Sequence, residues 1–290
     1  MIPLLPDLIL EPLVRAALLE DLGRMGDVTC RAVIPPGTTC TAHLRARQAG
    51  RLSGLAVAAL AFRLVDPGLA IRPLAADGTP CAAGQTLLSV TGETAAILAA
   101  ERVALNFAAR LSGIATLTAG FVAETRGTAT RITCSRKTTP GLRMVEKLAV
   151  LHGGGSSHRF DLSDAILIKD NHIAAGGGLD RVLRAARAAV SHMMKIEVEV
   201  DTLDQLDTVL RIGGADVVLL DNMTTEQLAE AVRRVEGRLV TEASGNMRLD
   251  RIAEVAATGV DYISSGALTH SAPALDLGLD IDAQTGPTGA

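Results

Sequence analysis

Two adjacent cations, Arg136 and Lys137, follow a short apolar run at residues 131–134 and precede two threonines and a Pro-Gly turn. The stretch SRKTTPG fits either a solvated surface turn or the anion-binding end of an active site. A planar guanidinium suits a carboxylate bidentately, whereas an ammonium suits a phosphate as a point charge. Basic dipeptides are common in surface turns, so the rest of the chain has to decide between the two.

Carboxylates recur at every second position of a later apolar run, EVEVD. In a strand, this spacing places Glu197, Glu199 and Asp201 on one face, which is expected to point into the fold or its mouth. Burying unpaired carboxylates is expensive, so this face needs cations, a metal or a substrate nearby.

The polar residues of the second half of the chain gather where predicted strands end. Cations come first and carboxylates later: Arg136, Lys137, His158, Arg159 and Lys169, then Glu199 and Asp221. This arrangement suits a ligand with a strongly anionic part, a phosphate, and a metal-bound or cation-like part. Phosphoribosyl diphosphate with an acidic acceptor is one such pair.

Two glycine-containing motifs follow the last two predicted strands. Ser244, Gly245 and Asn246 stand after one strand, and Ser265 and Gly266 stand after the next. Each motif precedes a helix or a turn, where free backbone N–H groups can hold a phosphate.

A regular alternation of elements positions these residues. From residue 130 onward, apolar β-rich runs alternate with helical patterns, which implies right-handed crossovers and a parallel sheet. No G-x-G-x-x-G motif follows the first run, so an α/β barrel is favoured over a doubly wound sheet. Catalytic residues of such barrels lie at the carboxyl ends of the strands, where the polar motifs stand. The predicted strands are 131–134, 165–169, 195–200, 216–220, 238–243 and 261–265.

The chain before residue 113 has a different pattern, with short β-like runs punctuated by Gly and Pro. The predicted elements are helices at 11–23, 56–65 and 93–112, and strands at 41–48, 69–75 and 85–90. We therefore predict an N-terminal α+β domain at 1–113 and an α/β-barrel catalytic domain at 114–271. The segment 272–290 is expected to pack back on the first domain and to fray at its end.

Composition excludes several classes of function. At 48% hydrophobic residues the 290-residue chain can bury a large core, and a net charge of -4 with 2% aromatic residues argues against nucleic-acid binding. Four cysteines without C-x-x-C spacing argue against a zinc site or disulfides. No uninterrupted apolar run reaches the roughly 18 residues of a membrane span. The start, MIPLLPDLIL, lacks a basic leader and is expected to be a packing arm, so we expect a cytoplasmic protein.

Nine stretches of the chain resemble the quinolinate phosphoribosyltransferase family, in the family's order and spacing. They are EDLGRMGDVT (20–29), ERVALNFAARLSGIAT (101–116), SRKTTPGLRMVEKLAV (135–150), GGGSSHR (153–159), ILIKDNH (166–172), EVEVD (197–201), LLDN (219–222), EASGN (242–246) and GVDYISSGALTHS (259–271). The similarity covers nearly the whole chain.

The resemblance implies an incomplete, open α/β barrel beside an α+β sandwich domain, and a magnesium-dependent reaction. Quinolinate and phosphoribosyl diphosphate would give nicotinate mononucleotide, diphosphate and carbon dioxide, on the de novo route to NAD. It also implies a homodimer, or a higher oligomer, in which Arg102 reaches the neighbouring subunit's site.

The resemblance also implies roles for individual residues. Arg136, His158, Arg159 and Lys169 would surround the two carboxylates of quinolinate. Lys137, Glu199 and Asp221 would serve phosphoribosyl diphosphate and its Mg²⁺, and the loops Ser244-Gly245-Asn246 and Ser265-Gly266 would take phosphate. Within this set, Lys137, Lys169, Glu199 and Asp221 are the expected catalytic residues.

One departure from the family and two rival functions stand beside this prediction. The family has an acidic residue and Thr before Arg-Lys, whereas this chain has Cys134 and Ser135. A lysine at a barrel strand end, here Lys169, could instead form a Schiff base as in a class I aldolase. A catalytically dead quinolinate sensor is the alternative outside enzymes. A related molybdenum-associated group shares the fold, but the Lys-Asp-Asn-His run is intact here.

Overall fold

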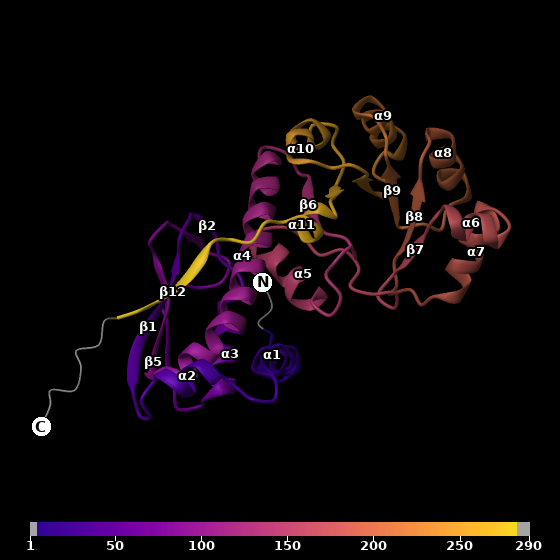
Figure 1. The fold of residues 1–290 in the computed structure, drawn as a ribbon. Coiled ribbons are helices and arrows are strands. Elements are labelled where there is room, and N and C mark those ends of the chain that lie inside the picture. Colours follow the sequence, from indigo (N-terminus) through magenta and orange to yellow (C-terminus); the bar gives the residue numbers. More distant parts are fainter. Residues whose placement is uncertain (1–4, 283–290) are drawn as a thin grey trace, which may run out of the picture. The chain divides into compact units, whose positions relative to one another are not determined.

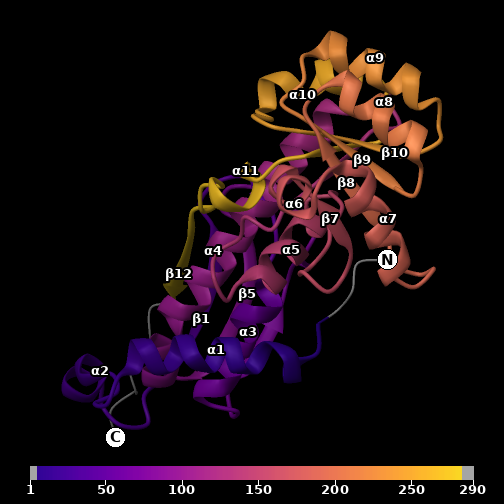
Figure 2. The same cartoon turned by 90° about the vertical axis from the view of Figure 1, so that its right-hand side faces the viewer.

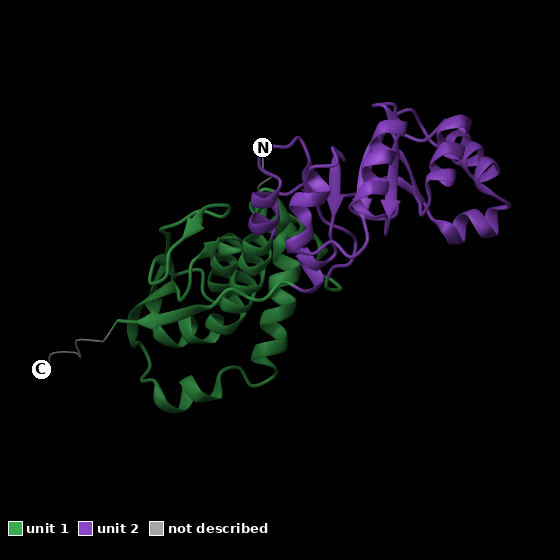
Figure 3. Cartoon of the chain, turned by 90° about the horizontal axis from the view of Figure 1, so that it is seen from above, with its two compact units in different colours: residues 1–117, 139–154, 272–290 green, residues 118–138, 155–271 purple. Residues whose placement is uncertain are grey.

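The computed structural model describes residues 5–282 (Figure 1). The first four residues of the expected N-terminal arm and the predicted frayed tail after residue 282 lie outside the described residues. The chain forms two compact units (Figure 3). Unit 1 comprises residues 1–117, 139–154 and 272–290, and unit 2 comprises residues 118–138 and 155–271.

Unit 1 is built on a four-stranded antiparallel sheet with the order β12-β1-β5-β3. Alternating burial along β1 places Ala42, Leu44 and Ala46 in the core, as period-two patterning requires. A short ribbon of β2 and β4 completes the strands. Their bounds are β1 Thr39–Ala46, β2 Gly50–Arg51, β3 Ala70–Pro73, β4 Pro80–Cys81, β5 Thr86–Glu93 and β12 Leu277–Ile281.

Within residues 5–282, unit 1 contains five helices or parts of helices. They are α1 Asp7–Leu22, α2 Val28–Val33, α3 Leu55–Val65, α5 Arg143–His152 and the first part of α4 Thr94–Glu124, whose last residues belong to unit 2. The apolar helix α3 buries Phe62 completely. The predicted end of the long helix at residue 112 is wrong, because Ile114 and Phe121 continue its buried stripe to residue 124.

Helix α4 is long and apolar enough to cross a membrane by length and composition, with a mean hydropathy of 1.2 in its best window. The sequence-based expectation counted only uninterrupted apolar runs and therefore passed over it. Of that window, 56% is buried inside the protein, as in the core helix of a soluble fold.

The units differ from the predicted domain boundaries in one internal stretch and at the first boundary. Residues 139–154, predicted as part of the barrel domain, belong to unit 1. They contain α5, which buries Val145 and Ala149, and the ring Nδ1 of His152 lies 2.8 Å from the Ser53 hydroxyl. The first boundary falls at residue 117 instead of 113, and β12 of the C-terminal segment pairs with β1.

The buried carboxylate of Glu146 fixes Thr139, the last residue of the SRKTT stretch at 135–139. Glu146 of α5 is fully buried, and its carboxylate accepts the backbone N–H of Thr139 at 3.0 Å and the Thr139 hydroxyl at 2.8 Å. Arg110 of α4 donates to the same carboxylate at 3.0 Å. Because each charge is paired and hydrogen-bonded, its burial is tolerated.

Unit 2 contains six parallel strands in the order β6-β11-β10-β9-β8-β7, as the alternating pattern predicted. Among the described residues no pairing joins the two edges, β6 and β7, so the barrel is open. The bounds are β6 Arg131–Thr133, β7 Ile166–Ile168, β8 Ile196–Val200, β9 Val217–Asp221, β10 Val240–Ser244 and β11 Tyr262–Ser264.

Helices follow the strands of unit 2, and α8, α9 and α10 (top of Figure 2) contact β8, β10 and β11. Reciprocal side-chain caps start two of them: Thr202 with Gln205 for α8, and Thr224 with Gln227 for α9. The bounds are α6 Asp170–Gly176, α7 Leu179–Ala189, α8 Leu203–Ile212, α9 Thr225–Val235, α10 Leu249–Ala256 and α11 Ala267–His270.

Candidate active site

The carboxyl ends of the six parallel strands meet at one edge of the sheet of unit 2, because all strands run in the same direction. A pocket of about 490 Å³ opens at this edge. Seven of the predicted site residues line it: Lys137, Asp221, Ser244, Gly245, Asn246, Ser265 and Gly266. Six further residues that the sequence-based prediction did not include line it as well, among them Asn222, Arg248 and His270.

The backbone around Gly245 adopts a conformation that only a few residue types tolerate. Asn222, Gly245 and Asn246 have positive φ angles of 53°, 90° and 49°, and glycine and asparagine are the residues that adopt this region most readily. A Cβ on Gly245 would lie 2.3 Å from Oδ1 of Asn222 and 2.8 Å from its backbone nitrogen. The turn therefore requires glycine at residue 245.

The second glycine motif is equally close-packed. Gly266 begins the single turn α11, and a Cβ there would lie 2.8 Å from Cδ of Lys137. The buried hydroxyl of Ser265 donates to the carbonyl of Met247 at 3.0 Å. Ser265 thus ties its own loop to the loop after β10.

Serine at residue 135 supplies a local contact where the family's acidic residue and Thr are missing. Its hydroxyl accepts the backbone N–H of Lys137 at 3.1 Å, and the Thr269 hydroxyl donates to the Lys137 carbonyl at 2.8 Å. Cys134 is completely buried. The backbone at Lys137 is therefore held from both sides without a carboxylate.

Lys169 and Glu199 form an ion pair across adjacent strand ends. The ammonium donates to Oε2 of Glu199, whose side chain is 15% exposed. His172 accepts the backbone N–H of Lys169 at 3.0 Å and so caps the start of α6. The three alternate carboxylates have different surroundings. Glu197 lies next to His158, and Glu199 pairs with Lys169. Asp201 lies past the end of β8 and is exposed.

Two arginines lie close together and keep donors available. Arg136 and Arg159 are each half-buried, and the buried Nε of each lacks a hydrogen-bond partner among the described residues. Burial and the neighbouring Arg136 lower the pKa of Arg159, and Glu197 and Asp164 partly offset this. Two like charges with unused donors favour binding of an anion.

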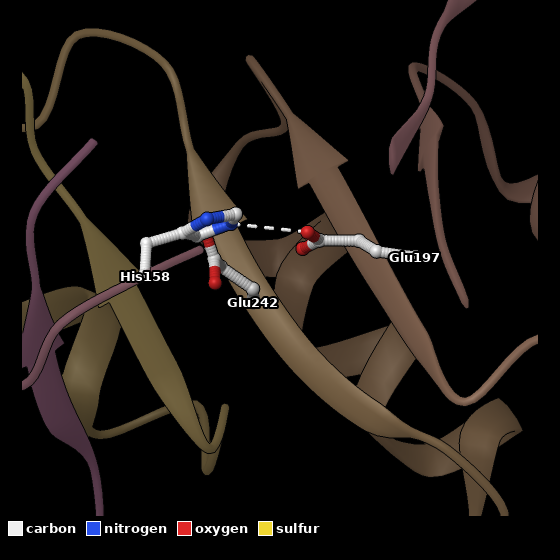
Figure 4. Close-up of side chains that lie close together, drawn as sticks. All are labelled: His158, Glu197 and Glu242. Carbon is white, nitrogen blue, oxygen red and sulfur yellow. Dashed lines mark ion pairs between the residues drawn. The ribbon is translucent and has the colours of Figure 1, made fainter. Parts of the chain in front are cut away.

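His158 reaches the same region because its segment runs beside β6. Thr133 pairs with Ser156 in a parallel bridge, and two residues later Nε2 of His158 lies 3.0 Å from Glu197 and 3.6 Å from Glu242 (Figure 4). Both carboxylates are buried. Glu197 was noted only through its spacing and Glu242 only as a strand-end residue, and neither was predicted as a site residue.

The spacing of His158, Glu197 and Glu242 would allow a metal ion, since one ligand atom from each lies within 4.8 Å of the others. The predicted metal ligands Glu199 and Asp221 are not part of this group. They stand at the ends of the neighbouring strands β8 and β9. Arg102 is exposed on α4, in unit 1.

An open α/β barrel whose strand ends combine glycine-rich turns, paired cations and carboxylates defines a transferase of acidic, phosphorylated substrates. Comparison with known families agrees with this class. Residues 27–112 match the quinolinate phosphoribosyl transferase N-terminal domain, and residues 114–280 match the quinolinate phosphoribosyl transferase C-terminal domain. The chain belongs to the quinolinate phosphoribosyltransferase family.

Individual relatives are similar over almost their whole length. The chain is 44% identical to the nicotinate-nucleotide pyrophosphorylase [carboxylating] of Mycobacterium leprae, covering 92% of this chain and 95% of that protein. It is 42% identical to quinolinate phosphoribosyltransferase [decarboxylating] 1b of Nicotiana tabacum, covering 97% and 85%. The solved nicotinate-nucleotide pyrophosphorylase of Francisella tularensis superposes with a TM-score of 0.92 at 36% identity, covering 97% and 99%.

Proposed function

We propose that this protein transfers the phosphoribosyl group of phosphoribosyl diphosphate to quinolinate, with loss of carbon dioxide, to give nicotinate mononucleotide for NAD biosynthesis. The observation that carries the proposal is that the residues at the strand ends form two groups. One group holds the half-buried arginines Arg136 and Arg159, which suit a dicarboxylate. The other is the pocket around Gly245 and Gly266, which suits phosphates.

The chemistry follows from where charge develops. Departure of diphosphate leaves an oxocarbenium-like ribose, and the carboxylates of Glu199 and Asp221 favour that positive charge. Lys137 stabilises the phosphate oxygens as a point charge. The quinolinate nitrogen then attacks the sugar carbon. After transfer, loss of carbon dioxide leaves an electron pair on the adjacent ring carbon. The positive charge of the pyridinium nitrogen stabilises this pair, and a proton then takes the place of the lost carboxylate.

The cations of the acceptor site mainly position the ring. Arg136, Arg159 and Lys169, with His158 beside them, surround the two carboxylates and hold the nitrogen toward the sugar, which is most of what a two-substrate transfer requires. The ion pair with Glu199 engages the ammonium of Lys169, whereas a Schiff base needs an uncharged amine. This contact favours the transferase over an aldolase.

We assign Mg²⁺ to Glu199 and Asp221, together with the substrate diphosphate. Both side chains offer the oxygen donors that Mg²⁺ prefers, and Asp221 lines the phosphate pocket. When bound, Mg²⁺ supplies neutralising charge to the leaving diphosphate. Glu199 and Asp221 orient the diphosphate end of the substrate.

The active unit we propose is a homodimer in which the exposed Arg102 completes the partner's site. Mixing an Arg102→Ala protein with an Arg159→Ala protein tests this, because a mixed dimer contains one site with both defects and one with neither. With free exchange, half the dimers are mixed, so about a quarter of wild-type activity is expected to return. No recovery after exchange, verified by mass-tagged subunits, would exclude a shared site.

We place the protein in the cytoplasm, although some plant relatives carry the descriptions mitochondrial and chloroplastic. The activity itself is tested by diphosphate release with quinolinate and with nicotinate as acceptors. Quinolinate is expected to support turnover and nicotinate is not, because nicotinate lacks the carboxylate that departs. A sensor would bind quinolinate without releasing diphosphate.

A further inference from the structure

We infer that Glu197 is a positioning residue for the acceptor site: it fixes the ring of His158, and His158 fixes the backbone at Arg159. The inference rests on the proposed function, because it takes Arg136 and Arg159 to bind the acceptor's carboxylates. Glu242 lies near the same ring, 3.6 Å from its Nε2.

The hydrogen bonds of His158 determine which nitrogen carries its proton. The backbone N–H of Arg159 donates to Nδ1 at 2.7 Å, so Nδ1 is the acceptor nitrogen. The proton of the neutral ring is therefore on Nε2, which lies 3.0 Å from Oε2 of Glu197 and 3.6 Å from Oε1 of Glu242 (Figure 4). Glu197 thus selects the tautomer that can accept from Arg159.

The same tautomer argues against a metal ion at this group. A metal-bound histidine normally offers a lone pair to the ion and donates its other N–H to an acceptor. Here Nδ1 accepts instead of donating, so a metal on Nε2 would require a doubly deprotonated ring. The nearby positive charge of Arg159 already interacts with Glu197 and would repel a cation.

Arg159 is held at two points as a result. Its backbone N–H is bonded to His158, and its Nη1 donates to the carbonyl of Ala165 at 2.9 Å. Its Nε is left buried without a partner among residues 5–282. A guanidinium fixed in this way, with unused donors, is arranged for an anion before the anion arrives. His158 acts on the acceptor site through the hydrogen bond that its Nδ1 accepts from the backbone of Arg159.

The test separates positioning from a general structural role. Glu197→Ala removes the acceptor for Nε2–H and is expected to raise KM for quinolinate by roughly 10–100-fold, as for a lost charge-assisted hydrogen bond. KM for phosphoribosyl diphosphate is expected to stay within about twofold, because the glycine-rich phosphate pocket does not include Glu197. The isosteric Glu197→Gln keeps an acceptor oxygen and is expected to recover most of the loss.

The matched control is Asp201→Asn, which alters an exposed carboxylate just past the end of the same strand and is expected to leave both KM values unchanged. Direct titration of quinolinate into each protein keeps the inference separate from turnover. Unchanged quinolinate affinity in Glu197→Ala, while wild type binds quinolinate and releases diphosphate, would overturn the inference alone. An equal rise in both KM values would also overturn the inference. The same holds for a stoichiometric metal that is bound to dialysed wild type and absent from Glu197→Ala. Absence of quinolinate-dependent turnover in wild type would instead refute the proposed function.

Discussion

Replacing Arg159 by Ala lowers kcat/KM for quinolinate by about 10²–10³-fold. Truncating one partner of a buried, hydrogen-bonded charge pair costs about 3–4 kcal/mol, and every 1.4 kcal/mol is about tenfold. Arg159 is half-buried beside Arg136, and its buried Nε is unpaired among the described residues, so the substrate carboxylate supplies the missing partner. Steady-state kinetics with each substrate varied in turn measure the effect.

The pattern across variants identifies the cause. Arg136→Lys keeps the charge but loses the fork that binds a carboxylate bidentately, so an intermediate loss is expected. Arg184→Ala, on an exposed helix position paired with Asp180, is the matched control and should leave kcat/KM unchanged. If Arg159→Ala bound quinolinate as wild type does, the assignment of the acceptor site would be wrong.

Replacing Gly245 by Ala raises KM for phosphoribosyl diphosphate by about 10²-fold or more. The added methyl meets backbone and side chain of Asn222 at 2.3–2.8 Å, so the turn must open. Positive φ alone costs a non-glycine residue about 1–2 kcal/mol, and the displaced backbone N–H groups lose the phosphate as well. The measurement is initial velocity with phosphoribosyl diphosphate varied at saturating quinolinate.

Gly237→Ala is the control variant, because it introduces backbone strain without a steric clash. Gly237 has a φ of +71°, and a Cβ there meets nothing within 4 Å. Both variants are expected to lose some stability, but only Gly245→Ala is expected to lose affinity for phosphoribosyl diphosphate. Equal kinetics for the two variants would show that the Gly245 turn does not hold phosphate.

The barrel was predictable because its strands carry a local signal. Period-two and continuous apolar runs mark β8 and β9, and polar residues mark their ends. The helix α5 was missed because it starts without a side-chain cap, at Leu142. The strand β12 was missed for another reason: its five residues, LGLDI, form a strand through pairing with β1, which no local pattern records.

The candidate site was likewise predictable in part from the sequence. The spacing of Glu197 and Glu199 predicted carboxylates that require partners, and the structure provides His158 and Lys169. The sequence could not show that Glu197 and Glu242 both reach His158, because β8 and β10 are separated by β9 in the sheet. The hydrogen bond between the Ser135 hydroxyl and the backbone N–H of Lys137 is local, yet the sequence did not predict it.

The ratio of carbon dioxide to diphosphate released decides whether the protein transfers phosphoribose to quinolinate with decarboxylation. Carboxyl-labelled quinolinate and phosphoribosyl diphosphate are mixed with the protein and Mg²⁺, and both products are counted over the same interval. The account predicts one carbon dioxide per diphosphate, neither product without both substrates, and no diphosphate release when nicotinate replaces quinolinate. Diphosphate release without carbon dioxide, or equal rates with nicotinate, would contradict it.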